Sequence, residues 1–177
     1  MKFSEDILKE FDLEPEGDKE PVNVMQISEM LQFLNACAKR MIQKSELYAR
    51  TDDPEIQMDC MDIVTVKLND FTQVFRDLII FIRKEEKTHK SGTSLRYCVT
   101  SFDTFNFEQT QAEKAFLREL LLRNEITHDY FNRELHQQKL IWIMLNCCEG
   151  ALDVYHDLNE YCADKNLLTR FADKNLS

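Results

Sequence analysis

Turn-forming residues are scarce in this chain of 177 residues, which has three glycines and three prolines. Collagen-like and low-complexity chains are rich in both residues, and β-sandwiches need a turn after every short strand, so these classes are excluded. Loops that hold the phosphates of a nucleotide need closely spaced glycines, so this kind of site is excluded as well. The composition therefore predicts long helices.

Long apolar runs and paired cysteines are also missing. The longest apolar stretches, residues 78–82 and 140–145, are too short to span a bilayer, and the acidic N-terminus does not have the pattern of a secretory signal. None of the six cysteines belongs to a C-x-x-C pair, and most stand where a helix would carry an apolar residue. We expect reduced core thiols in a cytoplasmic protein, with no membrane segment and no structural zinc.

Positive charge is in short supply, because 22 lysines and arginines face 32 acidic residues, for a net charge of -10. This balance argues against binding of nucleic acid or anionic membranes through bulk charge. Residues 1–22 hold eight acids and three lysines, which is half of the net charge. We expect an acidic arm over residues 1–22, either loose or lying over a basic cleft as a mimic of RNA, then a helical domain over 23–166 and a tail over 167–177.

Apolar residues at steps of three and four predict a first helix ending near Arg50, then a helix of more than 30 residues that begins at Asp53-Pro54. A short helix is expected around residues 95–102, and two capping-box patterns, at 106–109 and 110–113, predict the start of a fourth helix. The apolar stripe from Ile141 to Cys162 predicts one closing helix that ends near Lys165. The fold expected is an all-α, up-and-down helical bundle of four to five helices.

The fourth predicted helix carries polar residues on an apolar face. Asn124 and His128 share that face with Leu117, Leu121 and Phe131, so both polar side chains need partners. For a single histidine in such a place, the ordinary interpretation is a core or interface residue satisfied by a neighbour.

Arg123 precedes His128 by five residues, which is about 140° around an ideal helix. The two side chains can meet only if the helix ends or distorts nearby, or if a second subunit completes the site. A catalytic pair would therefore favour a dimer.

The run Arg123-Asn124-x-x-x-His128-x-Tyr130 resembles the R-x4-H-x-Y motif of HEPN-domain ribonucleases, in particular the HepT-type toxins. The order of the predicted helices over residues 24–166 is similar too. The resemblance implies a HEPN-like homodimer, with two motifs facing each other, that cleaves RNA without a metal ion or other cofactor. It further implies a nucleotidyltransferase antitoxin, MntA, that silences the toxin by attaching AMP to the motif tyrosine, here Tyr130.

The chemistry of these residues agrees with that activity. His128 titrates near neutral pH and could take the proton of a ribose 2′-OH or protonate the leaving 5′-oxygen. The Arg123 guanidinium would stabilise the charge that grows on the phosphate, and Asn124 would orient the phosphate or His128. The basic groups to hold RNA would come from residues 83–96 and from a set near the motif, namely Arg118, Arg123, Arg133 and Lys139. A solvated helix end is the alternative for the charges of residues 83–90.

Two other classes remain open. One is a HEPN-like helical partner without catalysis, such as the substrate-binding subunit of a nucleotidyltransferase. The other is a di-iron carboxylate bundle, because Glu86-x-x-His89 and Glu125-x-x-His128 have the spacing of its ligands. The additional carboxylates of such a site would be those of Glu29 or Glu46 and of Glu149.

Overall fold

A long helical hairpin forms the frame of the molecule. The computed structural model describes residues 25–126 and 133–168, and it places α1 over Met25–Arg50 and α2 over Pro54–Glu85. The carboxylate of Asp53 caps α2, because it accepts hydrogen bonds from the backbone N–H groups of Glu55 at 2.9 Å and Ile56 at 3.4 Å. Pro54 follows in the first turn, where its missing N–H costs nothing. The predicted cap is confirmed, and so is the predicted length, since α2 has 32 residues.

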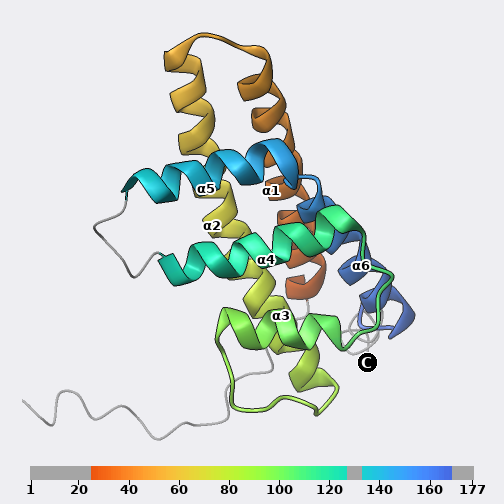
Figure 1. Ribbon diagram of the computed structural model, residues 1–177. Helices are drawn as coiled ribbons and strands as arrows, with labels where there is room; N and C mark the ends of the chain where they lie inside the picture. The colour runs from red at the N-terminus through yellow and green to blue at the C-terminus, as the bar shows by residue number, and fades with distance from the viewer. Residues whose placement is uncertain (1–24, 127–132, 169–177) are drawn as a thin grey trace, which may run out of the picture.

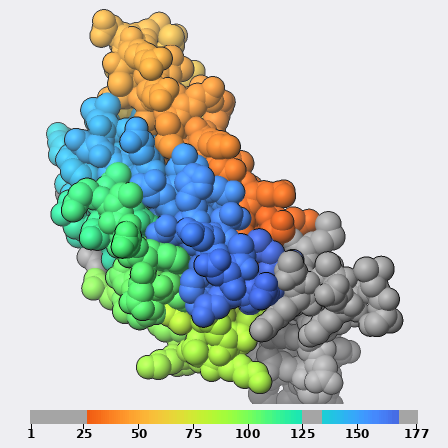
Figure 2. Space-filling view, turned by 90° about the vertical axis from the view of Figure 1, so that its right-hand side faces the viewer, coloured from red at the N-terminus to blue at the C-terminus, as the bar shows by residue number. Residues whose placement is uncertain are grey.

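Four further helices lie against this hairpin, and they are α3 (Leu95–Asp103), α4 (Gln111–Ile126), α5 (Arg133–Asn146) and α6 (Gly150–Asp164). Helices α3, α4 and α5 are stacked across the hairpin, and α5 contacts both α1 and α2 (Figure 1). The closed end of the hairpin projects beyond α5, as the space-filling view also shows (Figure 2). The all-α helical bundle is confirmed, with six helices in the described residues where four to five were expected.

The core is made by the apolar stripes that the sequence predicts for the first two helices. Every residue of the α2 stripe is fully buried: Val64, Leu68, Phe71, Phe75, Leu78 and Ile82. Aromatic rings then join α2 to its neighbours, since Phe71 meets Phe116 of α4 edge-on at 5.4 Å and Phe75 meets Phe102 of α3 at 5.8 Å. All six cysteines are buried and free, which confirms the expectation of reduced core thiols.

The closing helix predicted from Ile141 to Lys165 is wrong, because the chain turns a corner at residues 147–149 between α5 and α6. Cys147 and Cys148 lie in this corner, and both are buried. The stripe of α5 is also rotated from the predicted one. Ile143 is buried, whereas Leu145 is 51% exposed.

The end of α6 closes the described chain with a left-handed turn. Asn166 has φ of 52°, and the backbone N–H of Leu167 donates to the carbonyl of Cys162 at 2.9 Å, which is a Schellman-type helix end. Leu167 is buried in the core. Core packing therefore continues at least through Leu167, one residue past the predicted boundary at 166.

Among the helices of the described ranges, none combines the length and the apolar character that a membrane crossing requires.

Gly150 is the residue that lets α6 start directly against α4. A Cβ placed on Gly150 would lie 2.3 Å from the carbonyl oxygen of Ala112 and 2.8 Å from the Cα of Glu113, which are both backbone atoms. We expect Gly150→Ala to lower the free energy of unfolding by about 2 to 3 kcal/mol, because the two helices must separate to admit a methyl group. Urea denaturation measures this change.

Gly92→Ala is the comparison variant, because the atoms nearest to a Cβ at Gly92 belong to the partly buried side chain of Tyr97, at 2.8 to 3.2 Å, and not to the backbone of a packed helix, so its loss of stability should be smaller. Equal losses of stability in the two variants would contradict the role given to Gly150.

Candidate functional site

The side chain of Arg123 lies in the last turn of α4 and reaches across to α2. Its Nη1 donates a hydrogen bond to Oδ1 of Asn69 at 2.8 Å. Phe116 and Leu120 are buried on the side of α4 that faces the core, and Arg123 follows Leu120 on that side at the helical spacing of three residues. The helical spacing therefore points the guanidinium of Arg123 toward α2, where Asn69 accepts its hydrogen bond.

A small polar pocket surrounds this hydrogen bond. It has a volume of about 150 Å³ and is lined by Asn69, Thr72, Gln73, Leu120, Arg123 and Asn124. Two of its polar groups are already engaged, because the hydroxyl of Thr72 donates to the carbonyl of Leu68 and the amide of Gln73 donates to Asp77. The guanidinium of Arg123 is thus the charged group of the pocket.

Burial lowers the pKa of Arg123, because it removes water from the charged form. A guanidinium stays protonated at any ordinary pH even so. Within the described part of the chain Arg123 makes no ion pair, and its one hydrogen-bond partner there is the neutral amide of Asn69. A partly desolvated cation with a neutral neighbour attracts an anion such as a phosphate.

The structure brings Asn124 to the same pocket as Arg123. Asn124 is exposed, although the predicted stripe would bury it or place it in an interface, whereas Leu117 on that stripe is buried and Leu121 is partly buried. Two of the four predicted site residues therefore lie side by side.

The other two site residues, His128 and Tyr130, lie outside the described residues, as does Phe131 of the predicted stripe. The bounds of α4 end at Ile126, between Arg123 and His128. Their relative placement stays a prediction, and so do the homodimer and the roles given to both residues.

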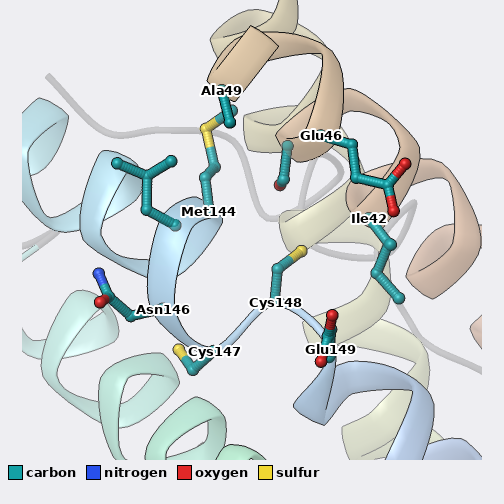
Figure 3. Close-up of a pocket in the computed structure, with 10 residues that line it drawn as sticks. Ile42, Glu46, Ala49, Met144, Asn146, Cys147, Cys148 and Glu149 are labelled. Carbon is teal, nitrogen blue, oxygen red and sulfur yellow. The ribbon is translucent and has the colours of Figure 1, made fainter.

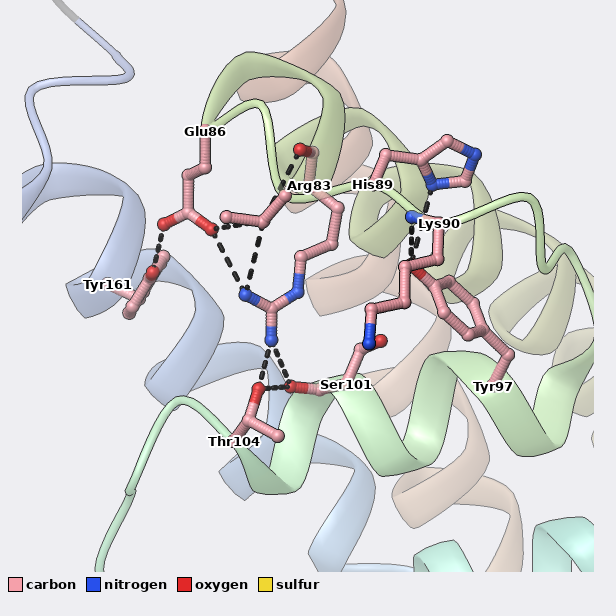
Figure 4. A network of polar contacts seen from close by, with 9 residues as sticks. Arg83, Glu86, His89, Lys90, Tyr97, Ser101, Thr104 and Tyr161 are labelled. Carbon is pink, nitrogen blue, oxygen red and sulfur yellow. Dashed lines mark hydrogen bonds and ion pairs between the residues drawn. The ribbon is translucent and has the colours of Figure 1, made fainter.

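Apart from Arg123, none of the described basic side chains expected to hold RNA lines this pocket. Arg83 is engaged in contacts within the protein. Its guanidinium donates to the carbonyl of Ser101 at 2.8 Å and to the hydroxyl of Thr104, and it pairs with Glu86 at 3.2 Å (Figure 4). It also lies 4.4 Å from the ring centre of Phe105. This side chain ties α2 to α3 and is not available as a surface cation.

Arg118 and Lys139 converge on one carboxylate, that of Glu119, at 3.3 Å and 3.2 Å. Glu119 is 3% exposed, and a buried negative charge needs a partner. The two cations compensate it. Arg118 of α4 and Lys139 of α5 therefore lie close together, as the sequence analysis expected. The anion between them is a carboxylate of the protein itself. The side chain of Arg133 lies outside the described residues.

The di-iron ligands suggested by Glu86-x-x-His89 have other partners. Glu86 pairs with Arg83 and accepts a hydrogen bond from the hydroxyl of Tyr161, and the ring of His89 meets that of Tyr97 (Figure 4). In residues 25–126 and 133–168 no three side chains of the kinds His, Cys, Asp and Glu lie close enough together to hold a metal ion.

Another cavity, of about 280 Å³, lies at the corner between α5 and α6. Figure 3 shows the side chains of Cys147 and Cys148 pointing away from each other across this corner. Burial raises the pKa of the Cys147 thiol to about 12 and that of Cys148 to about 11, so both stay protonated at neutral pH and are poor nucleophiles. This corner is a structural feature and offers no reactive thiol.

The sequence analysis missed a pair of carboxyl groups, the buried Glu113 of α4 and the partly buried Asp157 of α6. Glu113 is 1% exposed, and desolvation, followed by the charge and the hydrogen bond of Asp157, raises its pKa to about 8. At neutral pH Glu113 therefore carries a proton and donates it in a hydrogen bond to Asp157. The capping box at Thr110 and Glu113 is visible in the sequence, but nothing in the sequence places Asp157 opposite it.

We compared the chain with protein-family models, characterised proteins and solved structures, and no match was found. The account of this site therefore depends on its own residues.

The carboxyl pair gives the protein a definite response to pH. The pKa of Glu113 is raised in the folded state, so the folded protein binds a proton that the unfolded chain releases between about pH 4.5 and pH 8. The free energy of unfolding should fall by a few kcal/mol as the pH rises through this range. We expect Glu113→Gln, whose amide donates in place of the acid proton, to flatten this dependence and to be more stable than the wild type at pH 8.

Chemical denaturation at several pH values measures the effect, and Glu108→Gln is the control because Glu108 is exposed. A wild-type stability that stays constant or rises between pH 5 and pH 8, once the change seen in the control is subtracted, would contradict the shared proton.

Proposed function

We propose that this protein is a metal-independent RNA endonuclease of the HEPN kind, acting in the cytoplasm. Arg123, Asn124 and His128 are the residues of its site. The observation that carries the proposal is the guanidinium of Arg123, which is partly desolvated, held in place by Asn69, and joined by Asn124 in one small pocket. This is an anion site at the end of the helix that leads into the segment with His128.

The proposed reaction is a transfer of the phosphodiester within the RNA. The ribose 2′-oxygen attacks the adjacent phosphorus, the bond from phosphorus to the 5′-oxygen breaks, and the products carry a 2′,3′-cyclic phosphate and a 5′-hydroxyl. His128 takes the proton of the 2′-OH or gives one to the leaving 5′-oxygen. Arg123 donates to the phosphate oxygens, whose charge grows in the transition state, and Asn124 orients the phosphate. Only RNA supplies the 2′-hydroxyl.

In this proposal two copies of the chain face each other, and a nucleotidyltransferase of the MntA kind regulates the site. Attachment of AMP to Tyr130 would bring a phosphate two residues from His128, where it would be drawn to Arg123 and block the path of the RNA phosphate. The reaction balances without a metal ion or other cofactor.

A non-catalytic helical partner, such as the substrate-binding subunit of a nucleotidyltransferase, is the second candidate. One observation favours it: the hydrogen bond from Arg123 to Asn69 ties α4 to α2, which is a sufficient structural reason for an arginine at this position.

RNA cleavage by the metal-stripped protein in EDTA at neutral pH separates the two functions. We expect the wild type to cleave RNA and His128→Ala to lose at least about 100-fold in rate, because a general acid or base contributes that much. The ends of the products are analysed for 2′,3′-cyclic phosphate.

His156→Ala is the control, because His156 is an exposed histidine on α6. If wild type and His128→Ala are equally inactive, the intact mass of the wild type shows whether the site is modified or non-catalytic. An AMP adduct on Tyr130 explains the lack of activity and supports the proposal. An unmodified mass overturns the proposal in favour of the non-catalytic partner.

Asn69 acts as a positioning residue in this proposal, since it holds Arg123 and donates nothing to the reaction. We expect Asn69→Ala to lower kcat about tenfold with little change of KM, because the guanidinium loses its orientation. Asn69→Asp should lower activity further, because a carboxylate would pair with Arg123 and neutralise it.

Gln73→Ala is the matched control in the same pocket, because the amide of Gln73 donates to Asp77, whereas Arg123 donates to Asn69. Equal loss of activity in Gln73→Ala and Asn69→Ala would show that the pocket matters only for folding.

A further inference from the structure

A groove runs between α3 and α4 on a part of the surface that the proposed site does not use. It has a volume of about 670 Å³, and it is lined by Val99, Asp103, Asn106, Phe107, Gln109, Lys114, Leu117, Arg118 and Leu121. Its floor is apolar, since Leu117 and Val99 belong to the hydrophobic core and Phe107 and Leu121 are partly buried against it. Such a floor would be covered by an apolar segment.

The α4 rim of the groove is positively charged. Lys114 and Arg118 stand four residues apart, one helical turn, so both point along the same side of α4. Lys114 is exposed and makes no ion pair in the described part of the chain, and the side chain of Arg118 is 65% exposed. The carboxylate beside Arg118, that of Glu119, is shared with Lys139, so it does not cancel the charge of the rim.

The opposite rim carries a single negative charge. Its carboxylate, Asp103, accepts a hydrogen bond from the amide of Gln109 at 3.0 Å. The groove therefore combines an apolar floor, one rim with two cations, and a second rim with one carboxylate among polar groups. An acidic amphipathic helix has the matching chemistry.

The chain itself contains such a segment before α1. Apolar side chains recur at Phe3, Ile7 and Phe11, which is the spacing of one helical face, and residues 3–14 hold five acids and one lysine. Asp6 and Glu10 are four residues apart, the same spacing as Lys114 and Arg118. Both the apolar face and the spacing of its charges match the groove.

The topology puts the start of α1 at the end of the bundle where the groove lies. Helices α1 and α2 run antiparallel, so the first turns of α1 lie beside the last turns of α2 (Figure 1). Helix α3 packs there too, through Phe75 with Phe102 and through the thiol of Cys98, which donates to the carbonyl of Arg76. Residues 14–24 can extend by roughly 35 Å, which is close to the length of α1 and lets residues 3–13 lie at a distance from the start of that helix.

We propose that residues 3–13 of the N-terminal arm dock as an acidic amphipathic helix in the groove between α3 and α4 of the same molecule. Phe3, Ile7 and Phe11 cover the apolar floor, and Asp6 and Glu10 pair with Lys114 and Arg118. The docked arm hides the exposed cations of this rim from any other polyanion. The inference does not depend on the proposed nuclease activity.

Hydrogen–deuterium exchange on the full-length protein tests the docking. Backbone amides of residues 3–13 should exchange at least about tenfold more slowly than in an unstructured peptide, and the protection should weaken at high salt. The double variant Lys114→Glu/Arg118→Glu should lose this protection, and adding Asp6→Lys/Glu10→Lys should restore it. The control is Arg40→Glu/Lys44→Glu, the same charge change at the same spacing on α1, which should keep the protection.

Several outcomes would overturn the proposal. The first is that residues 3–13 exchange freely in the wild type. The second is that their protection survives Lys114→Glu/Arg118→Glu, and the third is that it grows with protein concentration, which would place the arm on a second copy. If the groove variant fails to fold, the arm variant Asp6→Lys/Glu10→Lys is the test, because it leaves the bundle unchanged. Protection of residues 3–13 that persists in the arm variant counts against the docking. A groove variant that changes only RNA binding would assign the rim to nucleic acid instead.

Discussion

Helix α2 buries a side chain in every turn from Cys60 to Ile82, and the positions of the other helices follow from that constraint. Helix α1 covers one side of the stripe, and the rings of Phe102 and Phe116 bring α3 and α4 against Phe75 and Phe71. Each large apolar side chain buried in this way stabilises the fold by about 1.5 to 3 kcal/mol relative to exposure. A polar residue introduced into the stripe would therefore disturb several helix contacts at once.

The candidate site depends on the same helix. Asn69 follows Leu68 of the buried stripe and projects from the edge of α2, where it meets the guanidinium of Arg123. Because Leu120 and Phe116 fix the rotation of α4 against α2, the direction of Arg123 is set by core packing one turn earlier. The position of the pocket that holds Arg123 is therefore set by the packing of two apolar stripes.

Much of the fold could be predicted from the sequence, because the signals for it are local. The cap at Asp53, the stripes of α1 and α2, the short helix near Leu95 and the capping box at Thr110 are each contained in a few consecutive residues. The corner at Cys147 could not be predicted in the same way, because helical spacing continues through it. A contact distant in sequence follows directly after the corner, the packing of Gly150 against the backbone of Ala112.

The site was predictable only in part for the same reason. Arg123 and Asn124 are neighbours in sequence and fall in one pocket, whereas their partner Asn69 lies on another helix 54 residues earlier. The carboxyl pair of Glu113 and Asp157 likewise joins two helices that periodicity alone cannot bring together. Motifs identify the residues of one element, but the environment that tunes their charge comes from elements far away along the chain.

The contact between α1 and α6 has a consequence for how the chain assembles. The α1–α2 hairpin is made of contacts local in sequence and can form early, with little loss of loop entropy. Helix α6 closes the bundle by returning to α1 across more than 100 residues. During synthesis, the side of α1 that α6 covers therefore stays exposed until Gly150 and the residues after it have left the ribosome, and in this interval the nascent chain needs protection from aggregation.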